Sequence, residues 1–248
     1  MSFKNLSGKI ALVTGSSRGI GRAMAERLSY EGASVAINYV NNANSAREVV
    51  AGIESAGGAA IAVQGDVSKL EDIQGLFDQT IEHFGRLDVL INNAGIRISK
   101  NVADITEAEF DRLFAINVKG TFFACQQAAR RLSDGGKIIN VSSTVTRMML
   151  PGYSIYAASK GAVDQITRVL AKELGGRNIT VNAVSPGPVD TDLFRDGKSE
   201  EQIQQMAQMA ALGRIGQVQD IADAVAFLAS EAARWITGQS IHVNGGYI

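Results

Sequence analysis

Seven short apolar segments, separated by longer segments with helical periodicity, constrain the fold of this chain most. Each is nearly continuous in apolar residues, which is typical of strands covered on both faces. The segments are 9–14, 33–39, 59–64, 87–92, 136–142, 179–185 and 239–244. Strands that alternate with helices over short connections require right-handed crossovers and hence a parallel sheet. The sequence therefore predicts an α/β fold, a doubly wound, seven-stranded parallel sheet with helices on both faces.

We expect the whole chain, 1–248, to form a single domain. Apolar residues make up 46% of the chain and charged residues 20%, which is enough for a large core. The three prolines, Pro151, Pro186 and Pro188, fall in loops expected after strands, so none marks a linker. Ser68–Glu71 and Thr106–Glu109 have the spacing of capping boxes, and each pair predicts the start of a helix.

Charge and cysteine content exclude several kinds of partner. The formal net charge is −1 and there is no run of Lys or Arg, which argues against nucleic acid or an acidic membrane surface. No apolar run approaches a membrane span, and the first residues lack the pattern of a signal peptide. Cys125, the single cysteine, excludes an intramolecular disulfide, and the two histidines are too far apart to predict a zinc site. We therefore expect a cytoplasmic protein with no metal.

The segment TGSSRGIG, 14–21, follows the first predicted strand and opens a helix. Gly15 allows a tight turn out of the strand, while Gly19 and Gly21 let a pyrophosphate and the neighbouring strand approach the helix start. The spacing is neither a strict GxGxxG nor a Walker A motif. Because strand, loop and helix occur in this order, the segment predicts a nucleotide site in a Rossmann-type domain.

Four motifs occur in order, and together they resemble the short-chain dehydrogenase/reductase family. They are TGxxxGxG at 14–21, NNAG at 92–95, a serine near the end of the fifth strand, and YxxxK at 156–160. The resemblance is to the branch of about 250 residues and covers the whole chain. It implies a cofactor half at about 1–135 and a catalytic and substrate half at about 136–248. It also implies hydride transfer between a nicotinamide cofactor and a carbonyl group.

The end of the second strand favours NADP (NADPH) over NAD. Tyr39 stands where NAD-preferring relatives usually carry Asp, and the next carboxylate is Glu48. Arg18 lies in the glycine-rich loop, where relatives use an arginine against the 2′-phosphate, and its planar donors suit phosphate.

The resemblance implies further cofactor contacts. Gly15, Ser17, Gly19, Ile20 and Gly21 would surround the pyrophosphate, Asp66 and Val67 the adenine, and Asn92, Ala94 and Gly95 the ribose. In the loop 186–191, Pro186, Gly187, Val189 and Thr191 would hold the nicotinamide carboxamide, through the Val189 backbone and the Thr191 hydroxyl. For Asp66 the alternative is a carboxylate that stabilises a turn.

Tyr156 and Lys160 are spaced i, i+4, so on a helix they share one face. A positive charge about 5 Å from a phenol favours the phenolate by about 3 kcal/mol at an effective dielectric constant of about 20. This predicts a phenol pKa lowered from about 10 to about 8, in the range of a general acid/base. Tyr153 follows Pro151 and Gly152, so we expect it at or before the helix start.

The resemblance assigns the remaining catalytic roles. The family's serine precedes its tyrosine by thirteen residues, which selects Ser143 over Ser142 to bind the substrate oxygen. Lys160 would also bind the nicotinamide ribose. Asn117 lies inside a long helical pattern, 107–132, where a helix irregularity would let it bind a water that links Lys160 to solvent. The alternative is a core asparagine that is satisfied locally.

The predicted function is an NADP(H)-dependent oxidoreductase that interconverts a carbonyl and a secondary alcohol, with Tyr156 as general acid/base. The segment 190–214 is expected to be a mobile helical lid. Candidate residues of the substrate pocket are Arg97, Val145, Met148, Met149, Tyr153, Pro188 and Phe194. The apolar run 146–150 makes a bulky or aromatic carbonyl compound plausible, although its methionines are equally consistent with ordinary packing.

Three alternatives stay open. One is a 3-ketoacyl-carrier-protein reductase of fatty acid synthesis, although the connection before the fifth strand is shorter than is usual in that group. Another is a catalytically silent NADP-binding regulatory protein, and the third is an epimerase or dehydratase of the longer branch. The resemblance also implies a homotetramer built through two long helices and the last strand.

Overall fold

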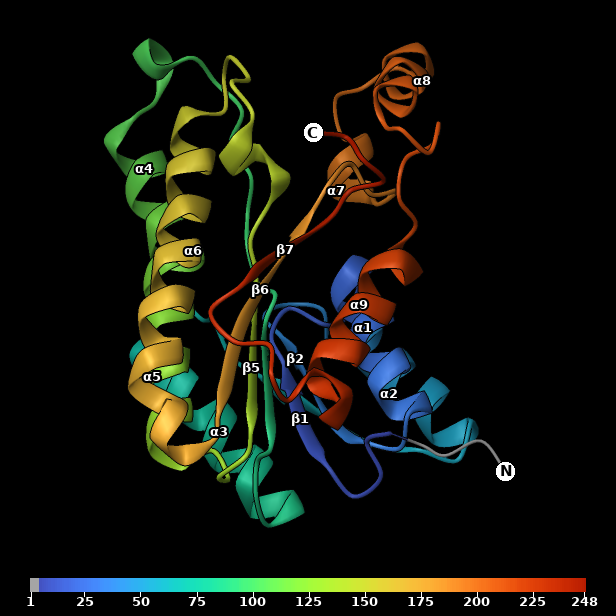
Figure 1. Cartoon of the computed structure of the whole chain (residues 1–248), viewed down its shortest axis with the longest axis vertical. Helices are drawn as coiled ribbons and strands as arrows, with labels where there is room; N and C mark the ends of the chain where they lie inside the picture. The colour runs from blue at the N-terminus through green and yellow to red at the C-terminus, as the bar shows by residue number, and fades with distance from the viewer. Residues whose placement is uncertain (1–4) are drawn as a thin grey trace.

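The computed structural model describes residues 5–248, and it is built on a seven-stranded parallel sheet (Figure 1). The strands are β1 (Ile10–Val13), β2 (Ser34–Tyr39), β3 (Ala59–Gln64), β4 (Val89–Asn92), β5 (Lys137–Val141), β6 (Thr180–Pro186) and β7 (Ser240–Val243). Their order in the sheet is β3-β2-β1-β4-β5-β6-β7. The predicted fold class is confirmed, and every strand lies within two residues of its predicted bounds.

Helices cover both faces of the sheet (Figure 1). On one face lie α1 (Gly19–Tyr30), α2 (Ala43–Ser55) and α9 (Val218–Ala229). On the other lie α3 (Leu70–Phe84), α4 (Glu107–Phe114), α5 (Thr121–Arg131) and α6 (Ser154–Leu174). Two short helices, α7 (Asp192–Arg195) and α8 (Glu200–Met209), follow β6. The 3-10 turns are η1 (Val102–Asp104), η3 (Thr144–Arg147), η4 (Gly175–Arg177) and η5 (Glu231–Ala233).

The sheet divides the core into two hydrophobic layers. In β1, Ala11 and Val13 pack into the layer beneath α1 and α9, whereas Ile10 and Leu12 pack into the layer beneath α3 and α5. Successive side chains of a strand point to opposite faces, so a strand buried on both sides must be apolar throughout. This is the physical reason for the continuous apolar segments in the sequence.

Two predicted helix starts have different outcomes. Thr106 and Glu109 form a capping box at the start of α4, as predicted. The box predicted at Ser68–Glu71 is wrong, because α3 begins at Leu70 after Lys69, one residue too late for Ser68 to cap it. The carboxylate of Asp72 instead accepts the backbone N–H of Asp66 at 2.8 Å, which ties the preceding turn to the helix.

The long helical pattern 107–132 is interrupted at its centre. A π-helix, η2 (Ala115–Gly120), separates α4 from α5 and contains Asn117. The helix irregularity expected at this position is therefore present. A π-turn carries one residue more than a regular turn, and it re-aims the side chains within it.

The segment 190–214 holds α7 and α8 and packs against the chain's last residues. The N–H of Leu212 donates to the carbonyl of Gly245 at 3.0 Å. Gly245 and Gly246 both have positive φ, 63° and 75°, which turns the tail back across this segment. Within residues 5–248, no helix is long and apolar enough to cross a membrane.

Candidate active site

The glycine-rich loop between β1 and α1 is shaped by close backbone approaches. Gly15 and Gly19 have φ of +61° and +56°, a region that side chains rarely adopt. A Cβ at Gly21 would stand 2.4 Å from the carbonyl oxygen of Gly15, so a side chain does not fit there. Helix α1 begins at Gly19 after an extended Arg18. The N–H groups of such a helix start form an anion site, and this geometry fits a pyrophosphate.

Two asparagines that sequence analysis did not single out hold this loop in place. Asn38, only 1% exposed, accepts the N–H of Gly15 at 2.9 Å and donates to the carbonyl of Gly65 at 2.9 Å. Asn93 donates to the carbonyls of Thr14 and Gly15, at 2.9 and 3.0 Å. Both follow the apolar part of a strand, and an amide at that position is the signal that could have identified them.

The residues predicted to select the cofactor lie on the surface beside the loop. Arg18 is exposed, and Tyr39, at the end of β2, is half-buried. The first carboxylate after Tyr39 in the sequence is Glu48, within α2. An exposed guanidinium beside a strand end that lacks a carboxylate suits a 2′-phosphate better than a bare ribose.

Two predicted cofactor residues have side chains that bond within the protein. One carboxylate oxygen of Asp66 accepts the N–H of Ser68 at 2.9 Å and stabilises the turn before α3, and this bond takes only one of the two oxygens. Asn92 is 4% exposed and donates to Asn140 at 2.9 Å and to Cys125 at 3.3 Å, so its side chain belongs to the core. A cofactor contact of Asn92 would have to come from its backbone.

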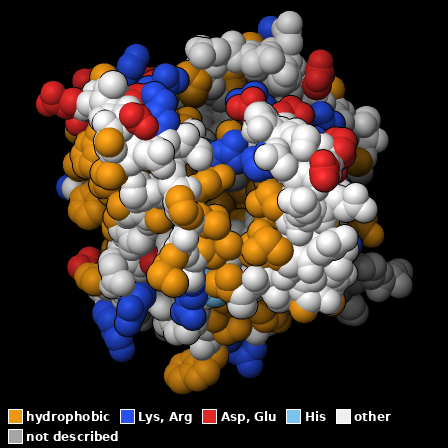
Figure 2. Space-filling view, turned by 90° about the horizontal axis from the view of Figure 1, so that it is seen from above, with side chains coloured by type: hydrophobic (Ala, Val, Ile, Leu, Met, Phe, Trp, Pro, Cys, Tyr) orange, Lys and Arg blue, Asp and Glu red, His pale blue; other side chains and the backbone are white. Residues whose placement is uncertain are grey.

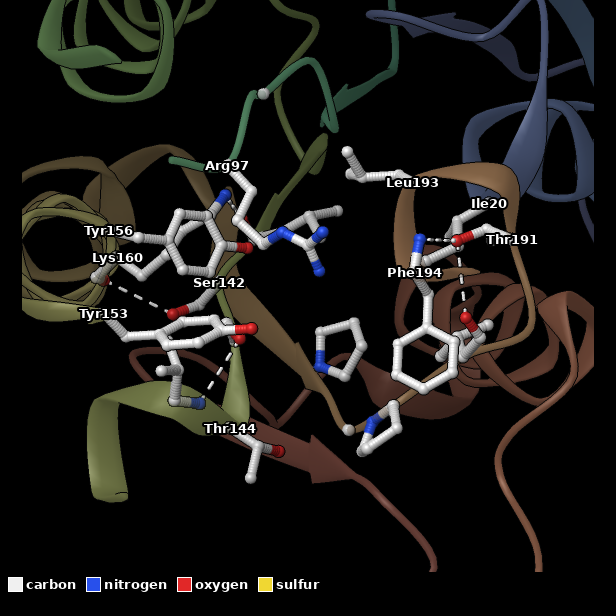
Figure 3. A pocket seen from close by; sticks show the side chains of 18 of the residues that line it. Ile20, Arg97, Ser142, Thr144, Tyr153, Tyr156, Lys160, Thr191, Leu193 and Phe194 are labelled. Carbon is white, nitrogen blue, oxygen red and sulfur yellow. Dashed lines mark hydrogen bonds between the residues drawn. The ribbon is translucent and has the colours of Figure 1, made fainter. Parts of the chain in front are cut away.

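A cavity of about 210 Å³ opens between the N-terminal part of α6 and the segment after β6 (Figure 3). It lies at the carboxyl ends of the strands, where open α/β sheets bind ligands. Tyr156 and Lys160 face Thr191 and Phe194 across it (Figure 3). Its lining includes the predicted residues Ile20, Gly95, Arg97, Ser143, Val145, Tyr153, Tyr156, Lys160, Pro186, Gly187, Pro188, Val189, Thr191 and Phe194.

Lys160 is buried beneath the tyrosine. It is 5% exposed, its Nζ donates to the carbonyl of Val141 at 2.7 Å, and this nitrogen is 5.9 Å from the centroid of the Tyr156 ring. Burial lowers the pKa of Lys160 to about 8, and the nearby Asp164 opposes that change only in part.

Burial raises the pKa of Tyr156 above its ordinary value, whereas hydrogen bonding with Ser143 and the charge of Arg97 act in the opposite direction. The sequence prediction, a phenol pKa lowered by Lys160, is therefore wrong for this geometry. It left out the cost of placing a phenolate in an apolar cavity, and it assumed a full charge on a lysine whose own pKa burial lowers. A raised pKa keeps the phenol protonated at neutral pH.

The two serines after β5 lie differently, as the extended backbone requires. Ser142 is 2% exposed and donates to the carbonyl of Lys160 at 3.3 Å, which ties β5 to α6. Ser143 is half-buried, lines the cavity and accepts the N–H of Val145 at 3.3 Å. Tyr153 is the N-cap residue of α6, as predicted, with its ring centroid 6.4 Å from that of Tyr156.

Asn117 connects the π-helix to the site. It is 1% exposed, accepts the N–H of Ile96 at 2.9 Å, and donates to the Ile96 carbonyl at 2.9 Å and to Ser159 at 3.1 Å. These bonds fix the loop 95–97 against α6. A Cβ at Gly95 would stand 3.3 Å from the Asn117 oxygen and 3.6 Å from the Lys160 Nζ, so glycine leaves room for both groups.

Sequence analysis missed part of the cavity wall. Tyr247, near the C-terminus, is 8% exposed, lines the cavity, and its hydroxyl is 3.4 Å from the sulfur of Met209 in α8. No local pattern points to a residue so far along the chain. Leu193 and Lys198 also line the cavity. Of the two methionines predicted there, Met148 lines the cavity, whereas Met149 is fully exposed and its predicted place in the pocket is wrong. Among residues 5–248, no group of acidic, histidine or cysteine residues could hold a metal ion.

The fold places the chain among the doubly wound, Rossmann-like α/β proteins. A family model described as "Enoyl-(Acyl carrier protein) reductase" matches residues 15–248. The short chain dehydrogenase/reductase AacuN of Aspergillus aculeatus is 45% identical, over 97% of this chain and 96% of that protein. Versicolorin reductase stcU of Emericella nidulans is 44% identical, over 97% and 96%.

Two solved structures are also similar. The angucycline C-6 ketoreductase LanV with bound NADP has a TM-score of 0.92 and 45% identity, over 98% of this chain and 96% of that one. A short chain dehydrogenase from Burkholderia cenocepacia J2315 in complex with NADP has a TM-score of 0.93 and 41% identity, over 98% and 99%. The chain therefore belongs to the short-chain dehydrogenase/reductase family and is an oxidoreductase.

Proposed function

We propose that this protein is an NADP(H)-dependent oxidoreductase that interconverts a carbonyl and a secondary alcohol, with Tyr156 as general acid/base. One observation carries the proposal. A tyrosine, a serine and a buried lysine line the same cavity as the end of the glycine-rich loop and the loop after β6. A carbonyl that gains hydride needs a proton donor and a polarising hydrogen bond beside it, and Tyr156 and Ser143 can supply them.

NADP is the cofactor that the residues fit. When bound, it supplies or accepts the hydride. The loop 15–21 would hold its pyrophosphate, and Arg18 its 2′-phosphate. The solved relatives with bound NADP support this choice over NAD.

In the direction of carbonyl reduction, Tyr156 gives its hydroxyl proton to the substrate oxygen, which Ser143 also hydrogen-bonds. The raised pKa of Tyr156 keeps that proton in place until it is needed. Lys160 stabilises the negative charge left on the phenolate, since its Nζ lies close to the ring. Asn117 acts through Ile96 and Ser159 as a positioning residue for the loop 95–97 and for α6. We further propose that Asn117 binds a water that links Lys160 to solvent.

The cavity wall supports a bulky or aromatic carbonyl substrate, because Val145, Leu193 and Phe194 are apolar and Tyr153 is aromatic. The names of the two relatives that contain "reductase" and "ketoreductase" support a ketone. Segment 190–214 would close over it as a lid.

A homotetramer is also part of the proposal. Phe122 on α5 is 50% exposed and Val169 on α6 is 58% exposed, so both long helices present apolar side chains that an interface would cover. Size-exclusion chromatography with light scattering tests this, and a monomeric mass would contradict it.

The central test is steady-state kinetics of Tyr156→Phe with NADPH over a panel of ketones, quinones, sugars and ketoacyl thioesters. We expect the substitution to reduce kcat by at least about 10²-fold while the NADPH affinity stays within about 3-fold, because only the proton donor is lost. Tyr153→Phe is the matched control and should retain most activity. Full activity of Tyr156→Phe would refute the mechanism.

A second measurement tests the preference for NADP independently of the catalytic mechanism. Arg18→Gln should raise the KM for NADPH about 10-fold and leave that for NADH unchanged, because a charge-assisted bond to phosphate is lost. Arg22→Gln is the control, since Arg22 is already paired with Glu26 at 2.8 Å. Tight NADPH binding without turnover of any panel member would favour the silent regulator instead.

A further inference from the structure

Besides the buried Lys160, the cavity wall holds two basic residues, Arg97 and Lys198, in a largely apolar setting. Arg97 lies on the loop after β4, and Lys198 lies between α7 and α8. Figure 3 shows the Arg97 side chain pointing into the cavity, between Tyr156 and Leu193. Figure 2 looks onto this end of the molecule and shows basic side chains at the central hollow, next to hydrophobic ones.

The charge of Arg97 is not neutralised within the described part of the chain. Arg97 is half-buried, and among residues 5–248 none of the ion pairs includes it. In the segment after β6, the carboxylates of Asp190 and Glu200 are bound by Arg195, at 2.6 and 2.7 Å. Asp196 acts on Lys198 through its charge.

Arg97 and Lys198 lie close enough for their charges to interact. Burial lowers the pKa of Lys198, the charge of Arg97 lowers it further, and Asp196 opposes the change. The charge of Arg97 also opposes the rise that burial causes in the pKa of Tyr156. Lys198 is positioned by a bond from its Nζ to the Phe194 carbonyl at 2.6 Å, with Nζ 4.8 Å from the centroid of the Phe194 ring. Two positive charges thus line the cavity, Arg97 beside the reactive phenol and Lys198 beside Phe194 on the facing wall.

A neutral apolar ligand would displace water from these cations without forming a hydrogen bond or ion pair in its place, which is unfavourable. An anionic oxygen would instead gain a charge-assisted, bidentate bond to the guanidinium. Since Arg97 lies beside Tyr156, that oxygen and the reacting carbonyl must belong to one compact molecule. We propose that Arg97, assisted by Lys198, binds an anionic oxygen substituent of the substrate, and that the substrate is an apolar carbonyl compound carrying a phenol, enol or carboxyl group. This rests on the proposed function, because it names the substrate of the same site.

The test is isothermal titration of the NADP-loaded enzyme with three naphthalene ligands: 2-naphthoate, which is charged at neutral pH, 2-naphthalenemethanol, its neutral counterpart, and the phenol 2-naphthol. We expect 2-naphthoate to bind at least about 10-fold more tightly than 2-naphthalenemethanol, as a charge-assisted bond in a half-buried site predicts. Arg97→Gln should abolish this preference, and Lys198→Gln should reduce it about 3-fold. Comparing naphthoate with naphthol distinguishes a carboxyl from a phenol substituent.

Arg147→Gln is the matched control, because Arg147 is exposed on the neighbouring η3 and should leave the preference intact. Equal affinity of the acidic and neutral ligands for the wild type would overturn the proposal, as would a preference that survives Arg97→Gln. These readouts need no turnover. An enzyme that binds the naphthoate selectively but reduces no carbonyl would refute the proposed function, and with it the carbonyl substrate, and would leave only the anion site at Arg97 standing.

Discussion

Replacing Lys160 by Met should make the protein more stable at neutral pH while removing its activity. Lys160 is 5% exposed and its pKa is lowered to about 8 from an ordinary value of 10.5. The folded protein therefore either holds a buried charge or releases a proton, and at pH 7 both are costly. Methionine has a similar length and carries no charge, so it removes that cost.

The magnitude follows from the difference between the two pKa values. A change from 10.5 to about 8 corresponds to about 3 kcal/mol of lost stability at pH 7. Methionine also loses the bond from Nζ to the Val141 carbonyl, worth about 1 kcal/mol. The net gain for Lys160→Met at pH 7 is thus about 2 kcal/mol, or a rise in Tm of about 4–8 °C for a chain of this size.

The pH dependence has a definite sign. Between pH 8 and 10.5 the unfolded chain binds the lysine proton and the folded one does not, so the stability of the wild type rises with pH across this window. The advantage of Lys160→Met should therefore shrink through that window and reverse slightly at its upper end. Above pH 10 the raised pKa of Tyr156 acts in the opposite direction in both proteins, so the comparison cancels it.

The assay is urea unfolding of wild type and variant without cofactor, at pH 7, 8, 9 and 10 and at one protein concentration. Lys172→Met, on the exposed side of the same helix, controls for the loss of one lysine from α6. A stability difference that stays constant from pH 7 to 10 would refute the reasoning, because the burial of the charge would then not be what separates the two proteins.

Three further outcomes are expected. Gly21→Ala should abolish NADPH binding, because its Cβ would stand 2.4 Å from a backbone oxygen. Gly52→Ala, in open space on α2, should instead raise the free energy of unfolding by about 0.5–1 kcal/mol. Equal effects of the two variants on NADPH binding and on unfolding would contradict this. Asn117→Ala loses three buried hydrogen bonds and should lower the free energy of urea unfolding by about 3 kcal/mol, so an unchanged midpoint would count against the positioning role. Burial raises the pKa of Cys125 to about 12, so a disulfide reagent such as DTNB should modify the native protein only as fast as it opens, and rapid labelling would be the contrary result.

The fold was predictable because it rests on patterns that are local. Continuous apolar strands, glycine at strongly constrained turns and one capping box can each be read within a few residues. The capping box at Ser68 failed because Asp66 accepts the N–H of Ser68, which Glu71 would accept in the box, and Asp72 accepts the N–H of Asp66. Spacing alone does not show which carboxylate takes each of these groups.

The residues of the site were more predictable than their pKa values. Helical spacing brought Tyr156 and Lys160 together, but it carried no information on burial, which reverses the expected change in the phenol pKa. The cavity wall formed by Tyr247 and Lys198 depends on how the tail folds back across α8. Such contacts join segments far apart in the chain, and the hydrophobic periodicity of the sequence does not predict them.

The π-helix at Ala115–Gly120 behaves as a one-residue insertion in what would otherwise be a continuous helix from α4 to α5. An engineer who idealised this helix by deleting one residue would improve its backbone hydrogen bonding. The same deletion would rotate everything on one side of it by about 100°, since each helical residue turns the chain by that angle. Asn117 would then face away from Ile96 and Ser159. Ancestral or designed versions of this chain should therefore tolerate changes at exposed positions of α4 and α5 more readily than a change in the length of the helix.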